Sequence, residues 1–198
     1  MKKSLIIIAF VILLLSATKY SNAQVTQLDK LLQNKILSGN VDSVKSVIKV
    51  GVDVNKRFNF GASGSISPLY LAIVLGYSEV AKLLIDSGAN AKMKFDGTNL
   101  LHIAALYGGN EAIVELLIKK GLDVNPKVKV YGEAKDMAPL HIAAGKGNFE
   151  VATALIKNGA DVNAKTNDGK APLDLAIINK KKEMVDLFKK YGGKPRKK

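Results

Sequence analysis

The sequence predicts an all-α fold, a solenoid of about five helix-turn-helix repeats connected by hairpin finger loops. Three observations predict it. One phrase recurs four times at a nearly constant period, glycines recur in phase with the ends of the implied helices, and a degenerate copy precedes the other four. Self-similarity at a period of roughly 20–50 residues is the sequence signature of stacked repeats. The 198 residues are enough to build a sizeable core from such a stack.

The recurring phrase is long and specific. One copy reads APLHIAAGKGNFEVATALIKNGADVNA from Ala138, and another reads NLLHIAALYGGNEAIVELLIKKGLDVN from Asn99. The slot that opens the first helix is filled by Pro68, Leu100, Pro139 and Pro172, at spacings of 32, 39 and 33 residues. Proline suits this slot because the first helical turn needs no N–H donor and the ring already sets φ.

Glycines predict where the helices end. Gly88, Gly121 and Gly159 are expected to close second helices, because a residue without Cβ turns the chain most easily there. The degenerate copy from Leu28 lacks the Pro-Leu-His start but keeps the second helix and its closing glycine. These boundaries predict a repeat domain over residues 24–193, with repeats at about 28–59, 60–95, 96–128, 129–167 and 168–193.

A period near 33 residues with a phrase close to T-P-L-H-x-A is typical of one repeat class. In this phrase the sequence resembles the ankyrin repeat family, over about five sixths of its length. The resemblance implies an ankyrin-repeat solenoid whose fingers and first helices form a concave side that binds other proteins. We therefore expect a monomeric protein-binding module. The partner is not identified, since a fold does not fix a function.

The sequence offers little support for catalysis. Its two histidines, His102 and His141, fill the same slot of different copies, and the resemblance implies that this imidazole hydrogen-bonds backbone and ties neighbouring repeats together. There is no cysteine, no Gly-rich phosphate loop, and no G-x-S-x-G or H-E-x-x-H motif. We expect no enzymatic activity, no catalytic residue, no metal site and no cofactor.

The tripeptide Asp-Val-Asn also recurs in phase, at residues 53–55, 123–125 and 161–163. Asp and Asn at this spacing could be read as calcium ligands, but the Gly and distal Glu of an EF-hand loop are missing. We interpret these residues as turn formers that satisfy local backbone groups.

Two fingers are longer than the repeat requires. Roughly six extra residues fall within 126–137, and the segment 58–65 is also long. Insertions in solenoids map to one face, which is often the binding face. Aromatic and methionine side chains in or beside the fingers are therefore the candidate partner contacts: Phe58, Phe60, Met93, Phe95, Tyr131 and Met137. The alternative is that some of them fold back to cover the hairpins or helix ends.

Residues 1–23 have the organisation of a secretory signal peptide of bacterial style. A basic start at Met1-Lys2-Lys3 precedes an apolar run from Leu5 to Leu15, and Ser21-Asn22-Ala23 offers the small residues that a signal peptidase reads. The run is shorter than the ~20 residues of a transmembrane helix. We expect export, with a periplasmic or secreted location after cleavage near Ala23; an uncleaved anchor is the alternative.

The chain is basic, with 30 Lys and Arg, 17 Asp and Glu, and a net charge of +13. Such a charge favours acidic proteins, nucleic acid or anionic membranes, although scattered lysines can simply maintain solubility. Only the C-terminal end is clearly clustered in lysine. The second function hypothesis is therefore a protein that associates with anionic lipid or nucleic acid through this end, without a specific nucleic acid target. Residues 194–198 are expected to form a disordered basic tail.

Overall fold

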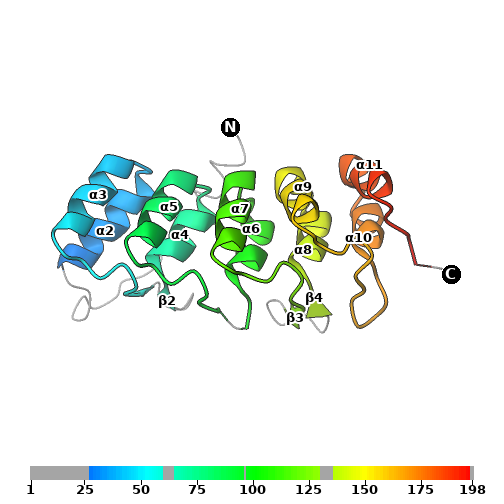
Figure 1. The fold of residues 1–198 in the computed structure, drawn as a ribbon, viewed down its shortest axis with the longest axis horizontal. Coiled ribbons are helices and arrows are strands. Elements are labelled where there is room, and N and C mark those ends of the chain that lie inside the picture. The colour runs from blue at the N-terminus through cyan, green and yellow to red at the C-terminus, as the bar shows by residue number, and fades with distance from the viewer. Residues whose placement is uncertain (1–26, 60–64, 96, 130–135, 197–198) are drawn as a thin grey trace. The chain divides into compact units, whose positions relative to one another are not determined.

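The computed structural model describes residues 27–59, 65–95, 97–129 and 136–196, and the chain divides into two compact units, residues 1–91 and 92–198. In the first unit the described helices form two pairs, α2 (Gln27–Leu37) with α3 (Val41–Lys49) and α4 (Pro68–Val74) with α5 (Ser78–Asp86). Helix α2 packs on α4 and α3 packs on α5, so this unit has an inner and an outer layer of helices (Figure 1).

The second unit repeats the arrangement with three described pairs. These are α6 (Leu100–Tyr107) with α7 (Glu111–Lys119), α8 (Pro139–Lys146) with α9 (Phe149–Lys157), and α10 (Pro172–Ile178) with α11 (Lys182–Lys190). Helices α6, α8 and α10 follow one another as the inner layer, and α7, α9 and α11 as the outer layer (Figure 1). The described helices confirm the all-α repeat class that the sequence predicts.

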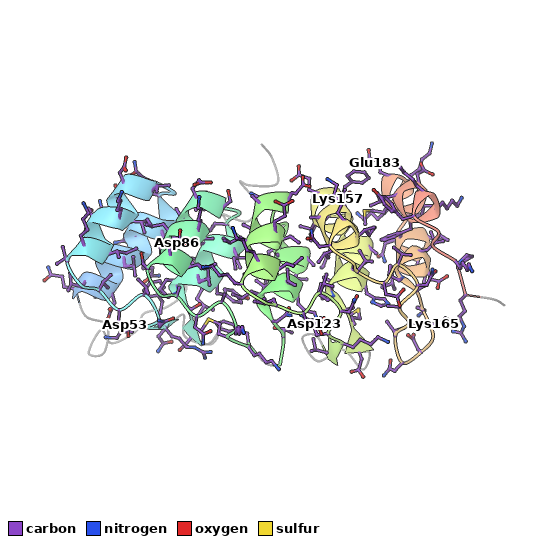
Figure 2. The ribbon with its side chains drawn as sticks, in the orientation of Figure 1. Asp53, Asp86, Asp123, Lys157, Lys165 and Glu183 are labelled. Atoms are coloured by element: carbon purple, nitrogen blue, oxygen red, sulfur yellow. The ribbon has the colours of Figure 1, made fainter. Side chains whose placement is uncertain are left out.

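Inner and outer helices differ in burial because they have neighbours on different numbers of sides. Every residue of α6 from Leu100 to Ala105 is buried, as is every residue of α8 from Pro139 to Ala144. Helix α7 instead buries Ile113, Val114 and Leu117 and exposes Glu115. Such a stripe is what a surface helix needs in order to cover a core on one side. Figure 2 shows Lys157 and Glu183 on the outer helices of this unit, and Asp123 and Lys165 on its loops.

The helix termini follow from local chemistry. Pro68, Pro139 and Pro172 are the first residues of α4, α8 and α10, where a missing N–H costs nothing. The hydroxyl of Ser67 accepts a hydrogen bond from the N–H of Tyr70 at 3.1 Å, and the side chain of Asn110 accepts one from Ile113 at 3.0 Å. These caps satisfy donors that have no partner within the helix.

The turn from inner to outer helix requires a left-handed backbone. Gly108 and Gly147 adopt φ of 84° and 79° there, which glycine tolerates at no steric cost. After α10 the same place is taken by Lys180 at φ 54°, the one positive-φ residue other than glycine in the described chain. A side chain in this conformation costs about 1 kcal/mol, so the last described helix pair carries some backbone strain.

The two long fingers are β-hairpins. Strand β1 (Phe58–Asn59) pairs antiparallel with β2 (Ser65–Ile66), and β3 (Val128–Lys129) pairs antiparallel with β4 (Asp136–Met137). The register joins Asn59 to Ser65 and Lys129 to Asp136, so residues 60–64 and 130–135 connect the paired strands. These connecting residues lie outside the described part of the chain.

The predicted signal peptide, residues 1–23, also lies outside the described residues. Among the helices that the structure describes, none has the length and apolar character to cross a membrane.

Candidate partner-binding site

The side chains that join neighbouring helix pairs belong to the recurring Asp-Val-Asn tripeptides. Asn125 donates its amide to the carbonyl of Gly159 at 3.1 Å and accepts the N–H of Asp161 at 2.9 Å. Asn55 bonds Gly88 and Asn90 in the same way, at 2.9 and 2.8 Å. Asn163 donates to Gly192 at 3.1 Å and accepts from Lys194 at 2.8 Å. We call Asn55, Asn125 and Asn163 the junction asparagines.

The aspartates of these tripeptides act locally, as the sequence predicts. The carboxylate of Asp123 accepts the N–H of Asn125 at 2.9 Å, and that of Asp161 accepts the N–H of Asn163 at 2.9 Å. The long reach of the asparagines was not part of the prediction, which treated them as local turn formers. Their recurrence in phase with the repeat was the available signal, because a contact between repeats must itself repeat.

His141 links its own inner helix to the following loop. Its Nδ1 accepts the N–H of Ala138 at 3.2 Å, so the proton is on Nε2, which lies 3.0 Å from the carbonyl of Ala164 and 3.2 Å from that of Lys170. A carbonyl can only accept, so Nε2 donates to both. The imidazole therefore joins the helix pair of α8 to the loop that leads into α10.

His102 makes the equivalent link one pair earlier. Its Nε2 donates to the carbonyl of Met137 in β4 at 3.2 Å, and its Nδ1 lies 2.6 Å from the side-chain oxygen of Asn99. The ring is buried, with 1% of its surface exposed. The two histidines thus occupy equivalent positions in different junctions, as their spacing predicts. No three His, Asp or Glu side chains converge on a metal position within the described residues.

Burial decides the protonation of both histidines. It lowers the pKa of His102 from its ordinary value to about 4, although hydrogen bonds to the carbonyls of Met137 and Pro126 act in the opposite direction. Burial likewise lowers the pKa of His141, against the carbonyls of Lys170 and Ala164. Both imidazoles are therefore neutral hydrogen-bonding groups at neutral pH.

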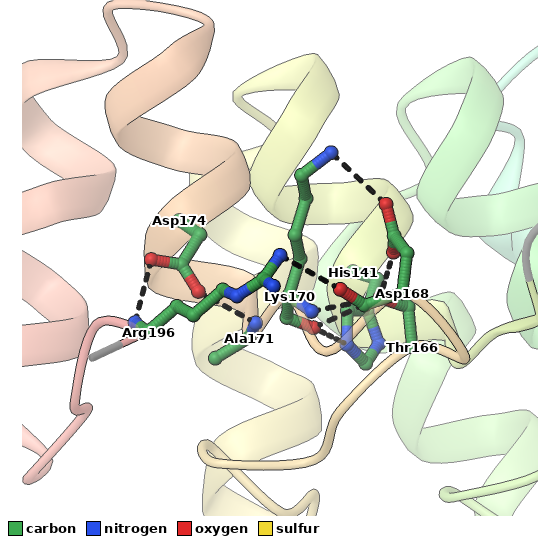
Figure 3. Close-up of polar contacts among 7 residues, drawn as sticks. All are labelled: His141, Thr166, Asp168, Lys170, Ala171, Asp174 and Arg196. Carbon is green, nitrogen blue, oxygen red and sulfur yellow. Dashed lines mark hydrogen bonds and ion pairs between the residues drawn. The ribbon is translucent and has the colours of Figure 1, made fainter. Parts of the chain in front are cut away.

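The C-terminal tail differs from its prediction. Residues 194–198 were expected to be disordered, yet residues 194–196 are held against the last helix pair (Figure 3). The N–H of Lys194 donates to Asn163, the N–H of Arg196 donates to Asp174 Oδ1 at 2.9 Å, and the Arg196 guanidinium donates to the carbonyl of Asp168 at 3.0 Å. We call residues 194–196 the docked tail. Lys197 and Lys198 lie outside the described residues.

The docked tail uses acceptors that are equivalent to those of the other junctions. Asp174 stands in the slot of His102 and His141, and its Oδ2 accepts the N–H of Ala171 at 2.8 Å as His141 Nδ1 accepts that of Ala138. Its other oxygen binds Arg196. The backbone N–H groups of Lys194 and Arg196 therefore complete the last junction, and the Arg196 guanidinium adds one bond to the loop. Backbone N–H groups are common to nearly all residues, which is why composition gave no indication of the docking.

Comparison with known proteins decides the family. A sequence model described as ankyrin repeats in three copies matches residues 32–128 and 126–198. The chain belongs to the ankyrin repeat family. Ankyrin repeats generally mediate protein–protein interaction, and the homologues found are typically not enzymes.

Curated ankyrin relatives align with part of the chain. The human Notch-regulated ankyrin repeat-containing protein is 31% identical over 108 residues, which are 54% of this chain and 93% of the relative. The ankyrin repeat, SAM and basic leucine zipper domain-containing protein 1 of Notamacropus eugenii is 30% identical over 62% of this chain, but the match spans only 25% of that relative. An ankyrin repeat protein of Rickettsia bellii is 35% identical over 89 residues, 43% of this chain and 12% of the relative.

The candidate contact residues of this ankyrin chain fall into three groups. Met93, Phe95 and Met137 lie half-buried in or beside the fingers, and the backbone of Phe95 pairs with Thr98. Phe60 and Tyr131 lie outside the described residues. Phe58 is buried, with 2% of its surface exposed, so the expectation of an exposed contact residue is wrong for it.

The position of Phe58 explains its burial. It is the first residue of β1 and stands opposite the half-buried Ile66 of β2, at the base of the hairpin. Alternate residues of a strand face opposite sides, so Phe58 points toward the core while its neighbour Asn59 is exposed. For Phe58 the alternative interpretation of the sequence is therefore correct: the side chain folds back to cover the interior instead of facing a partner.

We predict that Phe58→Ala lowers the free energy of unfolding by about 3 kcal/mol, since it empties a fully enclosed aromatic site. Phe149→Ala is the matched control, because Phe149 is 43% exposed, and it should cost less than about 1 kcal/mol. Urea unfolding of both variants measures the difference. Equal losses would mean that Phe58 is not enclosed.

We also predict that acid destabilises the fold through His102. The unfolded chain binds a proton near pH 6.5 and the folded chain only near 4, so this stabilisation is present above about pH 6.5 and is lost as the pH falls toward 4. The shift corresponds to roughly 3 kcal/mol. Denaturant unfolding from pH 7 to pH 4 should show a shallower fall in His102→Gln than in the parent chain. Parallel curves would contradict the low pKa.

Proposed function

We propose that this chain is a non-enzymatic, monomeric module of about five ankyrin repeats that holds another protein. Family membership over most of the chain supports the general role. The observation that carries the specific proposal is the β3–β4 hairpin. The last paired residues of this hairpin are Lys129 and Asp136, and the six residues 130–135 connect them. Among the described residues of this finger, the junction uses the base, through the carbonyl of Met137.

The finger residues supply the proposed contact surface. Met93, Phe95 and Met137 are half-buried, so each keeps part of its side chain available to a partner. Aromatic and methionine side chains at such positions contribute much of the binding energy at protein interfaces. On their place in the finger sequences alone, we propose Tyr131 as a further contact residue of this second unit and Phe60 as a contact residue of the first unit.

We further propose that the chain acts after export. The basic start, the apolar run from Leu5 to Leu15 and the small residues before Gln24 support a cleaved signal peptide and a location in the cell envelope or secreted space. Intact-mass analysis of protein isolated from its own host should give a chain that starts at Gln24. A full-length chain in the membrane fraction would contradict export with cleavage.

The role of the β3–β4 finger can be tested by shortening it. Replacement of residues 130–135 by Asn-Gly should form a two-residue turn between Lys129 and Asp136, because this dipeptide favours the turn of tight hairpins. We expect an unchanged or higher melting temperature and at least about tenfold weaker binding of the partner that the mature chain captures in its native compartment. Tyr131→Ala alone should reproduce much of the loss.

The other hairpin offers a matched control. Asn59 and Ser65 are also paired, so residues 60–64 can be replaced by Asn-Gly in the same way. If the partner binds the first variant as well as the parent chain, the β3–β4 finger is not the contact. Loss in the second variant would then assign the contact to the β1–β2 finger, and loss in neither would overturn the proposal that fingers bind the partner.

A further inference from the structure

A cleft lies between the docked tail and the loop that precedes α10. Its volume is about 440 Å³, and it is lined by Asn163, Lys165, Gly169, Lys194, Pro195 and Arg196. Three of these six residues are cations and none is an acid. We call this space the tail cleft. It exists because residues 194–196 are bound back to the loop rather than extended into solvent.

The acids nearest to the tail cleft are already engaged. Asp168 is 3.0 Å from the Lys170 ammonium and accepts the hydroxyl of Thr166 at 2.6 Å (Figure 3). Both oxygens of Asp174 accept backbone N–H groups, from Ala171 and Arg196. These acids therefore compete weakly for Lys165, Lys194 and Arg196, and the cleft keeps a positive potential.

The fold holds the guanidinium of Arg196 and the backbone of Lys194 in place. The Arg196 guanidinium carries five N–H donors, and its bond to the carbonyl of Asp168 uses one nitrogen while fixing the orientation of the group. Lys194 is positioned through its backbone bond to Asn163. Because the fold already orders the Arg196 guanidinium, a bound anion would incur less of the entropy cost of arranging that group.

The occupant that fits best is an acidic peptide segment. Pro195 and the aliphatic stems of Lys165 and Lys194 give the cleft apolar walls beside its charges, which suits an aspartate or glutamate flanked by apolar side chains. A recess of this size admits one or two side chains, whereas a membrane presents a flat surface. The lining also has no aromatic residue on which a nucleic acid base could stack.

We propose that the tail cleft binds a carboxylate side chain of an acidic peptide on the partner protein. The proposal rests on the protein-binding function proposed above and adds the chemistry of the partner. It also assigns to Lys165, Lys194 and Arg196 a role as one recognition site rather than as part of a diffuse positive charge.

Helix α10 also carries exposed apolar residues. Ile177 is 49% exposed, although the equivalent Ala105 and Ala144 are fully buried beneath the next helix pair. It lies three residues after Asp174, which binds the tail, so both are on the same face of α10. An acidic peptide with a neighbouring apolar residue could use both features.

The test uses the full chain and a rhodamine-labelled peptide, Gly-Glu-Asp-Leu-Glu-Glu-Leu-Asp-Glu-Gly, with fluorescence anisotropy as the readout. The cleft variant Lys165→Gln, Lys194→Gln, Arg196→Gln should bind the peptide at least about tenfold more weakly than the parent chain. The control variant Lys182→Gln, Lys189→Gln, Lys190→Gln has the same net charge but leaves the cleft lining intact. It should lose less than about threefold. Equal losses in the two variants would show a diffuse field and overturn the proposal.

A third variant separates geometry from charge. Asp174→Ala removes an acid, so a diffuse field would bind the acidic peptide more tightly, whereas release of the docked tail should weaken binding. Tighter binding by this variant, with helix content preserved in circular dichroism, would overturn the proposal. So would the absence of peptide binding by the parent chain.

Two further probes decide between classes of ligand. Mixed phosphatidylserine–phosphatidylcholine vesicles and a single-stranded thymidine oligonucleotide are measured against the same variants. Binding of either that depends on the cleft, without binding of the peptide, would replace the proposal by an anionic lipid or nucleic acid. If the peptide does not bind at the cleft, the proposal that the fingers bind the partner is unaffected. If shortening the fingers does not weaken partner binding, the peptide result is unaffected. The two proposals can therefore fail separately.

Discussion

Each helix pair in this chain can bury its apolar residues only against a neighbouring pair, and this constraint determines most of the structure. Inner helices such as α6 and α8 bury six consecutive residues each, from Leu100 to Ala105 and from Pro139 to Ala144, because they pack on other helices of the unit. Neighbouring helix pairs are also joined by hydrogen bonds of polar side chains. The junction asparagines bridge a backbone carbonyl and an N–H of the next segment. The buried imidazole of His141 instead accepts an N–H at the start of its own helix and donates to carbonyls of the following loop. The stability of such a chain is approximately the sum of the stabilities of its repeats and of the interfaces between neighbouring repeats. A hydrogen bond that recurs at every interface therefore contributes more than one that occurs once.

Polar groups in the junctions also limit where binding function can evolve. The carbonyl of Met137 and the carboxylate of Asp174 are committed to holding the stack, and substitutions that disturb them would change stability before they changed recognition. Exposed residues such as Lys165, in the loop before α10, make no such junction bond among those described. Variation can accumulate there while the stack remains intact, as is usual for loops on a rigid scaffold.

Much of the fold could be predicted from particular residues. Pro68, Pro139 and Pro172 start inner helices, where proline needs no N–H partner and already has a helical φ. Gly88, Gly121 and Gly159 follow outer helices at φ near 90°. The two long fingers were located by counting residues, and both are hairpins. Lys180 shows the limit of this approach, since the structure keeps the left-handed turn even where the sequence offers no glycine.

The candidate site was less accessible to prediction. Whether Phe58 faces the core or solvent depends on strand register, and one residue of shift reverses the answer. The docked tail depends on backbone N–H groups, which leave no trace in composition. The bonds of the junction asparagines to the next segment could not be predicted, because Asp-Val-Asn can be explained by its local turn alone. Nothing in the tripeptide itself indicates that the asparagine side chain also contacts residues about 30 positions later.

The docked tail has a consequence for how these molecules meet one another. The open end of a repeat stack resembles the open edge of a β-sheet, because both present unfilled hydrogen-bonding groups and apolar surface to an identical copy. In this chain residues 194–196 occupy the acceptors of Asn163 and Asp174, and Asn163 is the counterpart of the asparagines that bond the next segment in the other junctions. A second molecule that bound Asn163 and Asp174 at this end would first have to displace the tail. The residues that line the tail cleft thus also reduce the hydrogen-bonding groups that this end of the described helix pairs offers to another copy.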